Sequence, residues 1–383
     1  MARDEVTATS PRTRMRRDIA AGMSVPDAVT KHSAVGAPAG KRAEDWLSLR
    51  AGQLGMNTRL LNLLATPGVT DVLINGTQIW VDRGRGCERV EGDFPDVAHV
   101  RRLAVQMAAA AGKRLDDSAP LVDGFLGDTI RMHAVLAPLA KEGPVISLRV
   151  LRPGGMTLDD LVDLGTLSEG LVKILRQAVA ARVSMLISGA TGAGKTTLLG
   201  ALLMEVPQDQ RIVCIEEVTE LLVDHPHLVH LQERQANVEG SGAVTLSELV
   251  RASLRMRPDR LVLGECRGPE IKEVLSAMNT GHTGGFTTIH ANRMDAVPAR
   301  LIALGALAGL NEDALEKQGS TAFQMVVHVV RGSDGKRRLS EVGVFADQKA
   351  IEVTPAWHWN GSAYVTGPGA LLFPAILEEF RGT

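Results

Sequence analysis

One short stretch constrains the fold of this chain more than any other. The glycine-rich run of residues 189–196 follows the apolar segment 183–188 and precedes a helix-forming segment over 196–205. Because glycine has no Cβ, this spacing allows a tight turn in which several backbone N–H groups point into one space at the start of a helix. A buried strand that turns directly into a helix is typical of a parallel sheet with helical crossovers. The run therefore predicts an α/β fold.

The segments around this run alternate between helical and strand-like patterns. A helix is predicted over residues 167–180, and the capping-box pair Thr245 and Glu248 predicts the start of another. A third helix, over 269–280, ends at Gly281, because glycine readily adopts the left-handed conformation that closes a helix. Buried strands are predicted at residues 211–215, 228–231, 261–263 and 286–289, and a late hairpin turn at 333–335.

The first part of the chain has a different organisation. Asn75 and Gly76 lie between two short apolar runs and predict a hairpin turn. A helix is expected over residues 99–111, and strands over 129–135 and 145–150. A chain of 383 residues is long enough for two domains. We expect a flexible tail at 1–45, a small α+β domain at 46–150, a linker at 151–166 and a larger α/β domain at 167–383.

Composition narrows the classes of function. The formal net charge is only −2 and aromatic residues make up 3%, so the composition does not favour nucleic-acid binding. Cys87, Cys214 and Cys266 are far apart and form no CxxC pair, which indicates reduced thiols in a cytoplasmic protein. No apolar stretch is long enough to span a bilayer, and the run at 301–310 predicts a buried helix. The basic cluster at 12–17 fits either a solvated tail or contact with acidic lipid or a partner.

The glycine run matches the pattern GxxxxGK[ST] at every fixed position. Its backbone N–H groups and the dipole of the following helix favour phosphate oxygens. The Lys195 ammonium adds charge for the β- and γ-phosphates, and the Thr196 hydroxyl can ligate Mg²⁺. The run therefore predicts a site for ATP and Mg²⁺. Its members, with the next residue included, are Gly189, Ala190, Thr191, Gly192, Ala193, Gly194, Lys195, Thr196 and Thr197.

Carboxylates follow two of the predicted strands. Glu265 comes just after the apolar run 261–263, and a carboxylate at that edge of a parallel sheet can reach Mg²⁺ or its water. The alternative is a surface glutamate in a loop. Glu216, Glu217 and Glu220 follow another strand, where they would repel phosphates unless they bind metal or activate water. The alternative for these three is a solvated acidic turn.

The stretch 281–292 carries two histidines and several hydroxyl groups around a short strand. His290 can hydrogen-bond a γ-phosphate from this position, although a histidine after a strand can also be purely structural. The density of polar side chains in the stretch favours a functional role.

These four elements, in this order, resemble those of the secretion ATPases that power type II secretion, type IV pili and type IV secretion. The likeness covers residues 55–345, and within it 234–292 is most similar to the TadA/CpaF branch, which serves tight-adherence (Flp) pili. The segments that carry it are Arg234, 237–240, 254–260, 264–268, 277–282 and 287–292, with 69–76 and 131–135 in the first domain.

The resemblance implies a RecA-like P-loop ATPase domain preceded by a smaller N-terminal α+β, PAS-like domain and a flexible tail. Residues 189–196 would be the Walker A loop. Glu265 would be the Walker B carboxylate and, with Thr196, a metal ligand, and His290 would belong to the His box.

The resemblance also assigns Glu216, Glu217 and Glu220 to the Asp box. Glu217 departs from the family pattern, because members commonly have Asp there, and this leaves open which of the three acts as the base. Arginines are implied near the γ-phosphate, where a guanidinium can stabilise the charge that spreads over the phosphate oxygens. The matching positions are Arg131 and Arg149, with Arg234 and Arg255 as supports.

The partners implied by the resemblance are further copies of this chain in a homo-hexamer, and integral inner-membrane platform proteins similar to TadB and TadC. The motor would act from the cytoplasmic face on pilin or a secreted substrate, with no nucleic acid involved. Two other functions stay open. The absence of a basic excess counts against a RecA-like nucleic-acid translocase. The intact Lys195, Thr196 and Glu265 count against a nucleotide-bound assembly protein without turnover.

Overall fold

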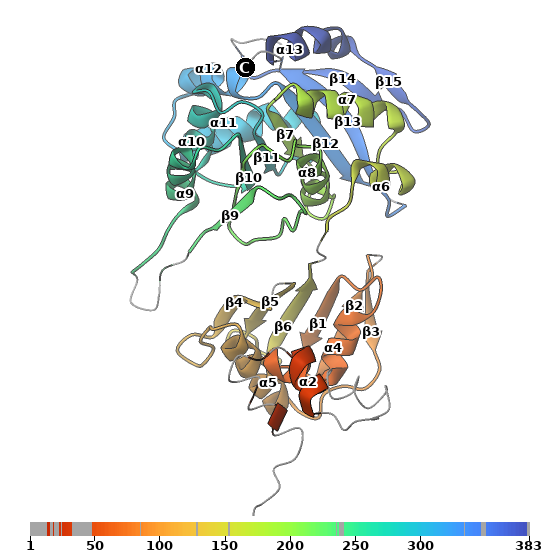
Figure 1. Cartoon of the computed structure of the whole chain (residues 1–383), viewed down its shortest axis with the longest axis vertical. Helices are drawn as coiled ribbons and strands as arrows, with labels where there is room; N and C mark the ends of the chain where they lie inside the picture. The colour runs from red at the N-terminus through yellow and green to blue at the C-terminus, as the bar shows by residue number, and fades with distance from the viewer. Residues whose placement is uncertain are drawn as a thin grey trace, which may run out of the picture. The chain divides into compact units, whose positions relative to one another are not determined.

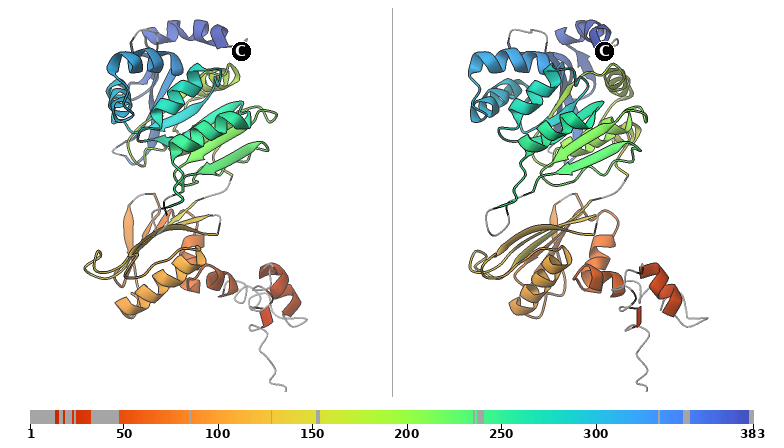
Figure 2. Two further views of the ribbon diagram at one scale, coloured as in Figure 1. Left: turned by 90° about the vertical axis from the view of Figure 1, so that its left-hand side faces the viewer. Right: turned by 60° about the vertical axis from the view of Figure 1, so that its left-hand side comes forward.

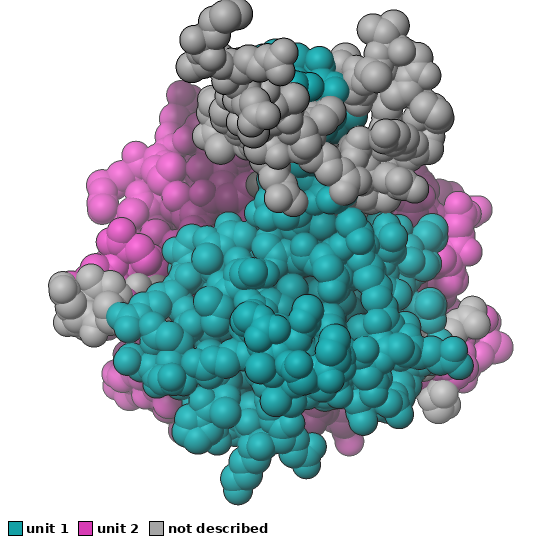
Figure 3. Space-filling model, turned by 90° about the horizontal axis from the view of Figure 1, so that it is seen from below, with its two compact units in different colours: residues 1–152 teal, residues 153–383 magenta. Residues whose placement is uncertain are grey.

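The computed structural model of the chain forms two compact units, residues 1–152 and 153–383 (Figures 1 and 3). None of the described helices is long and apolar enough to cross a membrane. Most of the predicted tail, the segment 237–240 and the turn residue Ser333 lie outside the described residues. The structure describes residues 14–15, 18, 23, 25–32, 48–84, 86–127, 129–151, 154–234, 236, 241–332, 334–345 and 350–380.

The first unit is built on a six-stranded antiparallel sheet with the strand order β3-β2-β1-β6-β5-β4. Helices α4 (Thr58–Ala65) and α5 (Val97–Ala110) pack their apolar sides against this sheet in one core (Figure 2). The strands are β1 (Asp71–Asn75), β2 (Gln78–Asp82), β3 (Cys87–Val90), β4 (Leu121–Leu126), β5 (Ile130–Val135) and β6 (Val145–Val150).

The predicted hairpin in this unit is confirmed. Asn75 pairs with Gln78, and Gly76 takes a φ of 59°, which glycine adopts without steric cost. The sequence does not predict β3 and β4. Strand β3 is largely exposed, and Gly124 interrupts β4, so neither shows a clear apolar alternation.

The predicted tail is not uniform, because it contains helix α2 (Val25–His32). Ala28 and Val29 of this helix share a small apolar cluster with Met15 and Leu49. An acidic residue in the first turn and basic residues in the last suit the helix dipole. Part of residues 1–45 is therefore helical and packed, which corrects the expectation of a flexible tail for this segment.

The second unit is built on a nine-stranded sheet with the order β15-β14-β13-β12-β7-β11-β10-β8-β9. Strands β12, β7, β11, β10, β8 and β9 pair in parallel, and β13, β14 and β15 add an antiparallel extension. Their bounds are β7 (Met185–Ser188), β8 (Ile212–Glu216), β9 (Leu228–Gln232), β10 (Arg260–Cys266), β11 (Phe286–Ile289), β12 (Met325–Arg331), β13 (Arg337–Phe345), β14 (Val353–Trp359) and β15 (Tyr364–Thr366).

Helices cover both faces of this sheet (Figure 1). One apolar core includes α6 (Leu158–Asp163), α7 (Glu169–Ala180), α8 (Lys195–Met204) and α13 (Phe373–Phe380). The other includes α9 (Leu246–Ser253), α10 (Ile271–Asn279), α11 (Val297–Leu307) and α12 (Glu312–Ala322). A parallel sheet between two helical layers has strands buried on both sides, which explains their continuous apolar runs. The predicted α/β class is confirmed.

Helix α6 corrects the prediction of a linker over residues 151–166. Thr157 and Asp160 form a capping box at its start, and Leu158 and Leu161 are buried in the core of the second unit. The pair Thr157 and Asp160 is a helix-start signal that the glycine-rich sequence before it obscures.

A fully buried arginine joins three elements of the second unit. Arg260 donates from Nε to Gln210 Oε1 (2.8 Å) and from its two terminal nitrogens to the carbonyls of Gly284 (3.2 Å) and Val179 (2.9 Å). Burial lowers the pKa of Arg260 to about 10, which leaves the group charged at pH 7. A Cβ at Gly284, two residues before β11, would lie 2.1 Å from a terminal nitrogen of Arg260, so the chain requires glycine there.

We predict that Gly285→Ala lowers the free energy of unfolding by about 1–3 kcal/mol. A Cβ at this position would lie 2.2 Å from Met278 Cε and 2.6 Å from the carbonyl oxygen of Leu261, and a strand backbone cannot move aside as a side chain can. Denaturant unfolding followed by circular dichroism measures the change. The control is Gly170→Ala in α7, where the nearest atom is 3.9 Å away. Equal stability of the two variants would show that this packing point is looser than the structure indicates.

Candidate active site

The glycine loop lies between β7 and α8, so the predicted strand–turn–helix is confirmed. Gly189 has a φ of 155°, and a Cβ there would fall 2.4 Å from the carbonyl oxygen of Val329. Gly194, with a φ of 105°, is the N-cap of α8 and has no side chain to accept from the first amides of the helix. Backbone N–H groups and the helix dipole therefore make this loop an anion site.

Lys195 is buried at the base of the loop, with 7% of the residue exposed. Its Nζ donates to the carbonyls of Gly189 (3.0 Å) and Ala190 (3.2 Å) and lies 3.4 Å from His290 Nδ1. Burial lowers the pKa of Lys195, and the nearby Glu265 opposes this effect. A buried cation held by neutral acceptors binds an anion more strongly than it binds those acceptors.

Further charged groups continue from His290. His290 Nε2 contacts Glu265 Oε1. Arg267 donates to Glu265 Oε2 (2.8 Å) and to Glu217 Oε2 (2.9 Å), so one guanidinium bridges the carboxylate near the end of β10 and the one that follows β8. Lys195, His290, Glu265, Arg267 and Glu217 are thus connected, and we call them the charged network.

The protonation of His290 follows from its partners. Burial lowers the pKa of His290, with Lys195 and Arg267 acting in the same direction, so the ring is neutral at pH 7. A ring protonated on Nε2 suits both neighbours, because Nδ1 then accepts from the Lys195 ammonium and the N–H at Nε2 lies on the side of Glu265 Oε1. This assigns the tautomer from the hydrogen-bond partners.

The three glutamates of the predicted acidic cluster have different surroundings. Glu216 is buried, and its Oε1 accepts from the backbone N–H groups of Glu220 (3.0 Å) and Leu221 (3.2 Å), which closes the turn after β8. Glu217 is bound to Arg267 instead. The pKa of Arg267 is raised mainly by its hydrogen bond with Glu265, and the charge of Glu220 adds to the effect.

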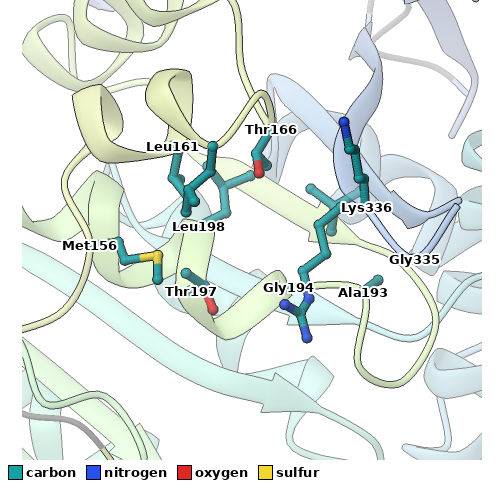
Figure 4. A pocket seen from close by; sticks show the side chains of 12 residues that line it. Met156, Leu161, Thr166, Ala193, Gly194, Thr197, Leu198, Gly335 and Lys336 are labelled. Carbon is teal, nitrogen blue, oxygen red and sulfur yellow. The ribbon is translucent and has the colours of Figure 1, made fainter. Parts of the chain in front are cut away.

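A pocket of about 200 Å³ adjoins the glycine loop. Figure 4 shows Met156, Leu161 and Leu198 together on one side, with Thr197 below them and Lys336 on the side of the β12–β13 turn. One wall is therefore apolar, while the other carries positive charge. The pocket extends the anion site into a space with room for a larger ligand group.

Three contacts around the loop are not predicted by the sequence. Arg337, from the start of β13, donates from Nε to the carbonyl of Gly192 (3.1 Å). His328 Nδ1 and Ser188 Oγ are 2.8 Å apart beneath the loop, and burial lowers the pKa of His328. Arg267 stands two residues after Glu265, so proximity in sequence could have indicated it. A basic residue after the turn at 333–335 is a weaker signal for Arg337, and His328 has none.

The four predicted arginines are not brought to the glycine loop by any described contact. Arg131 and Arg149 are paired across β5 and β6 and belong to the first unit, with Asp123 and Asp71 as their respective ion-pair partners. Their role at the nucleotide stays a prediction.

The two predicted supports belong to the second unit. Arg234 donates from Nε to the carbonyl of Gly242 (2.5 Å), and Arg255 is exposed on the short helix Leu254–Met256. No described hydrogen bond joins either of them to residues 189–196, so their predicted contact with nucleotide also stays a prediction.

A family model described as type II/IV secretion system protein matches residues 57–360. The chain belongs to this family. It is 48% identical over 304 residues to a Mycobacterium tuberculosis (strain H37Rv) protein that is named as a conjugal transfer protein. The aligned region covers 77% of this chain and 86% of that protein. It is 31% identical to the type IV secretion system protein VirB11 of Brucella suis, over 73% of this chain and 86% of that protein.

Solved structures of the same fold include the ATPase DotB of Legionella pneumophila, with a TM-score of 0.54 and 20% identity over 76% of this chain and 80% of that one. The pilus retraction motor PilT with bound ADP has a TM-score of 0.55 and 18% identity over 85% of this chain and 87% of that one. The predicted RecA-like core is consistent with these structures.

We predict that Glu216→Ala lowers the free energy of unfolding by about 1–3 kcal/mol, because two buried backbone N–H groups lose their acceptor. Glu217→Ala removes the exposed partner of an ion pair and should cost less than about 1 kcal/mol. Denaturant unfolding in the presence of a chelator and without nucleotide measures both. If Glu217→Ala is the more damaging change, the structural role of Glu216 is wrong.

Proposed function

We propose that this chain hydrolyses ATP to ADP and phosphate and works as the motor of a secretion or pilus system. The observation that carries the proposal is the charged network, which connects the buried Lys195 at the glycine loop with a neutral imidazole and two carboxylates. Membership of the type II/IV secretion family supports the same activity.

The residues of the loop fit ATP with Mg²⁺. Gly189 and Gly194 let the loop pass close to Val329 and Arg337, where a Cβ would collide or crowd, and Lys195 brings the positive charge. Thr196 and Glu265 offer the oxygen ligands that Mg²⁺ prefers. Bound Mg²⁺ would neutralise negative charge on the phosphates while the γ-phosphoryl group is transferred.

The groups of the charged network then have distinct tasks. When ATP binds, the Lys195 ammonium exchanges its carbonyl acceptors for phosphate oxygens. His290 Nδ1 then loses the ammonium as its hydrogen-bond partner. Glu265 and Glu217 are the candidates for accepting a proton from the attacking water. Arg267 binds Oε2 of both carboxylates, so a proton accepted at that oxygen requires its release from the guanidinium.

We place the base and ribose of the nucleotide in the pocket beside the loop. Its apolar wall of Met156, Leu161 and Leu198 suits an aromatic base, and Thr197 lies between this wall and the loop. Lys336 and Arg337 add positive charge on the opposite side, where phosphate oxygens would benefit from it.

We propose more specifically that the chain forms a homo-hexamer of the TadA/CpaF type that assembles tight-adherence pili. In this proposal Arg131 and Arg149 close on the γ-phosphate, and Arg234 and Arg255 support the site. The motor would be cytoplasmic and peripheral at the inner membrane, acting on pilin or a secreted substrate through platform proteins similar to TadB and TadC. The resemblance of residues 234–292 to that branch supports this choice.

We predict that Lys195→Ala lowers ATP turnover at least about 10²-fold, because the buried charge on the phosphates is lost. Glu265→Gln should slow turnover by about 10²–10⁴-fold while ATP affinity changes only a few-fold. Phosphate release and equilibrium binding of a fluorescent ATP analogue measure the two effects. The matched control is Lys173→Ala, which removes an exposed ammonium from α7. If Lys195→Ala retained full turnover, the proposed ATP site at the glycine loop would be wrong.

The hexamer is tested by the native mass of the full chain with and without ATP and Mg²⁺. Light scattering on a gel-filtration column should give six times the 40.9 kDa chain mass when nucleotide is bound. Arg131→Ala should then lower turnover without changing that mass. A monomer with turnover strongly stimulated by DNA or RNA, and with a steep salt dependence, would favour a nucleic-acid translocase instead. A hexamer that binds ATP without turnover would favour the assembly protein.

A further inference from the structure

Three metal-ligating side chains gather on one face of strands β8 and β9. Cys214 and Glu216 are two residues apart on β8, so their side chains leave the same face of the sheet. His230 on β9 is the register partner of Cys214 and joins them on that face. The sequence alone does not connect them: Cys214 is expected only to be a reduced thiol, Glu216 belongs to the acidic cluster, and His230 carries no prediction.

The donor atoms of these side chains are close enough to share one ion. The Cys214 Sγ, one Glu216 carboxylate oxygen and one His230 ring nitrogen all lie within 4.8 Å of one another, and His230 Nδ1 is 3.7 Å from Glu216 Oε2. Donors around a tetrahedral Zn²⁺ are roughly 3–4 Å apart, given bond lengths of about 2.0–2.3 Å. Of the three side chains, the exposed His230 ring has room to move closer to the Cys214 and Glu216 donor atoms.

The Glu216 carboxylate is an independent sign that a cation belongs here. Only 5% of the residue is exposed, and its Oε1 is fixed by two backbone N–H groups. Its Oε2 is buried, and in the described part of the chain no N–H or hydroxyl group donates to it; its neighbours are the Cys214 thiol and the His230 ring. A thiol is a weak donor, so this buried carboxylate oxygen is poorly compensated, and a cation removes that cost. The backbone bonds to Oε1 also hold the carboxylate in place, as is usual for a metal ligand.

We propose that Cys214, Glu216 and His230 bind a Zn²⁺-like transition-metal dication, with water in the fourth position. A sulfur, nitrogen and oxygen donor set favours such an ion over Mg²⁺ or Ca²⁺, which prefer oxygen ligands. The ion can enter from the side of His230, because β9 is the edge strand of the described sheet. Bound there, it ties β9 to the turn that Glu216 closes, next to Glu217. This inference does not depend on ATP hydrolysis.

The test uses the full chain, freed of metal by a chelator and titrated with Co²⁺ without nucleotide. A tetrahedral cobalt–thiolate site has a sulfur-to-metal charge-transfer band and intense visible d–d bands. We expect both at one equivalent, lost on addition of Zn²⁺. Cys214→Ser should abolish the charge-transfer band, and His230→Gln should weaken Co²⁺ binding at least about 10-fold. The matched control, Cys87→Ser, removes the exposed thiol of the first unit and should leave the spectrum unchanged.

Two results overturn the proposal. The absence of a charge-transfer band in the unmodified chain means that the Cys214 thiol serves only as a buried neighbour of Glu216. A band that persists in Cys214→Ser places the metal at another thiol. Circular dichroism in chelator shows whether Cys214→Ser is folded, and the surface change His230→Gln provides a second reading that does not alter the buried core. Neither result bears on the ATP site, whose failure is measured by Lys195→Ala.

Discussion

A buried ammonium group has to be compensated wherever it lies, and much of the candidate site is arranged around that of Lys195. The loop carbonyls of Gly189 and Ala190 and the neutral ring of His290 accept from it, and Glu265 supplies an opposite charge. These groups come from different parts of the chain. The parallel pairing of β7, β11 and β10 brings their carboxyl ends to one edge, so residues far apart in sequence reach the same cation.

The same geometry separates the predicted glutamates into different kinds of group. Glu216 is the last residue of β8 and turns back to its own backbone, whereas Glu217, one residue later, reaches Arg267. A change of one position along a strand end thus decides between a structural contact and a place in the charged network. The resemblance implies that these residues share one box, but their hydrogen bonds place them in different surroundings.

Sequence patterns predict the parts of this molecule that depend on local chemistry. The turn at Gly76, the capping box of Thr245 and the strand–loop–helix around Lys195 follow from the residues within each segment. Arg337 could not be predicted in the same way, because its contact with Gly192 spans 145 positions and depends on where β12 enters the sheet. The buried role of Arg260 likewise requires the packing of α7, β10 and β11 to be known.

The place of β12 in the sheet has a consequence for how the protein is made. Strand β7 leads into the glycine loop, yet one of its two neighbours in the sheet is β12, and the carbonyl of Val329 in that strand lies against Gly189. Arg337 follows directly afterwards and is joined to Gly192 across 145 positions. When the glycine loop of a nascent chain has just emerged from the ribosome, the neighbouring strand β12 and the basic wall of the pocket have not yet been synthesised. The loop therefore gains these two neighbours only late in translation, after most of the second unit has been synthesised.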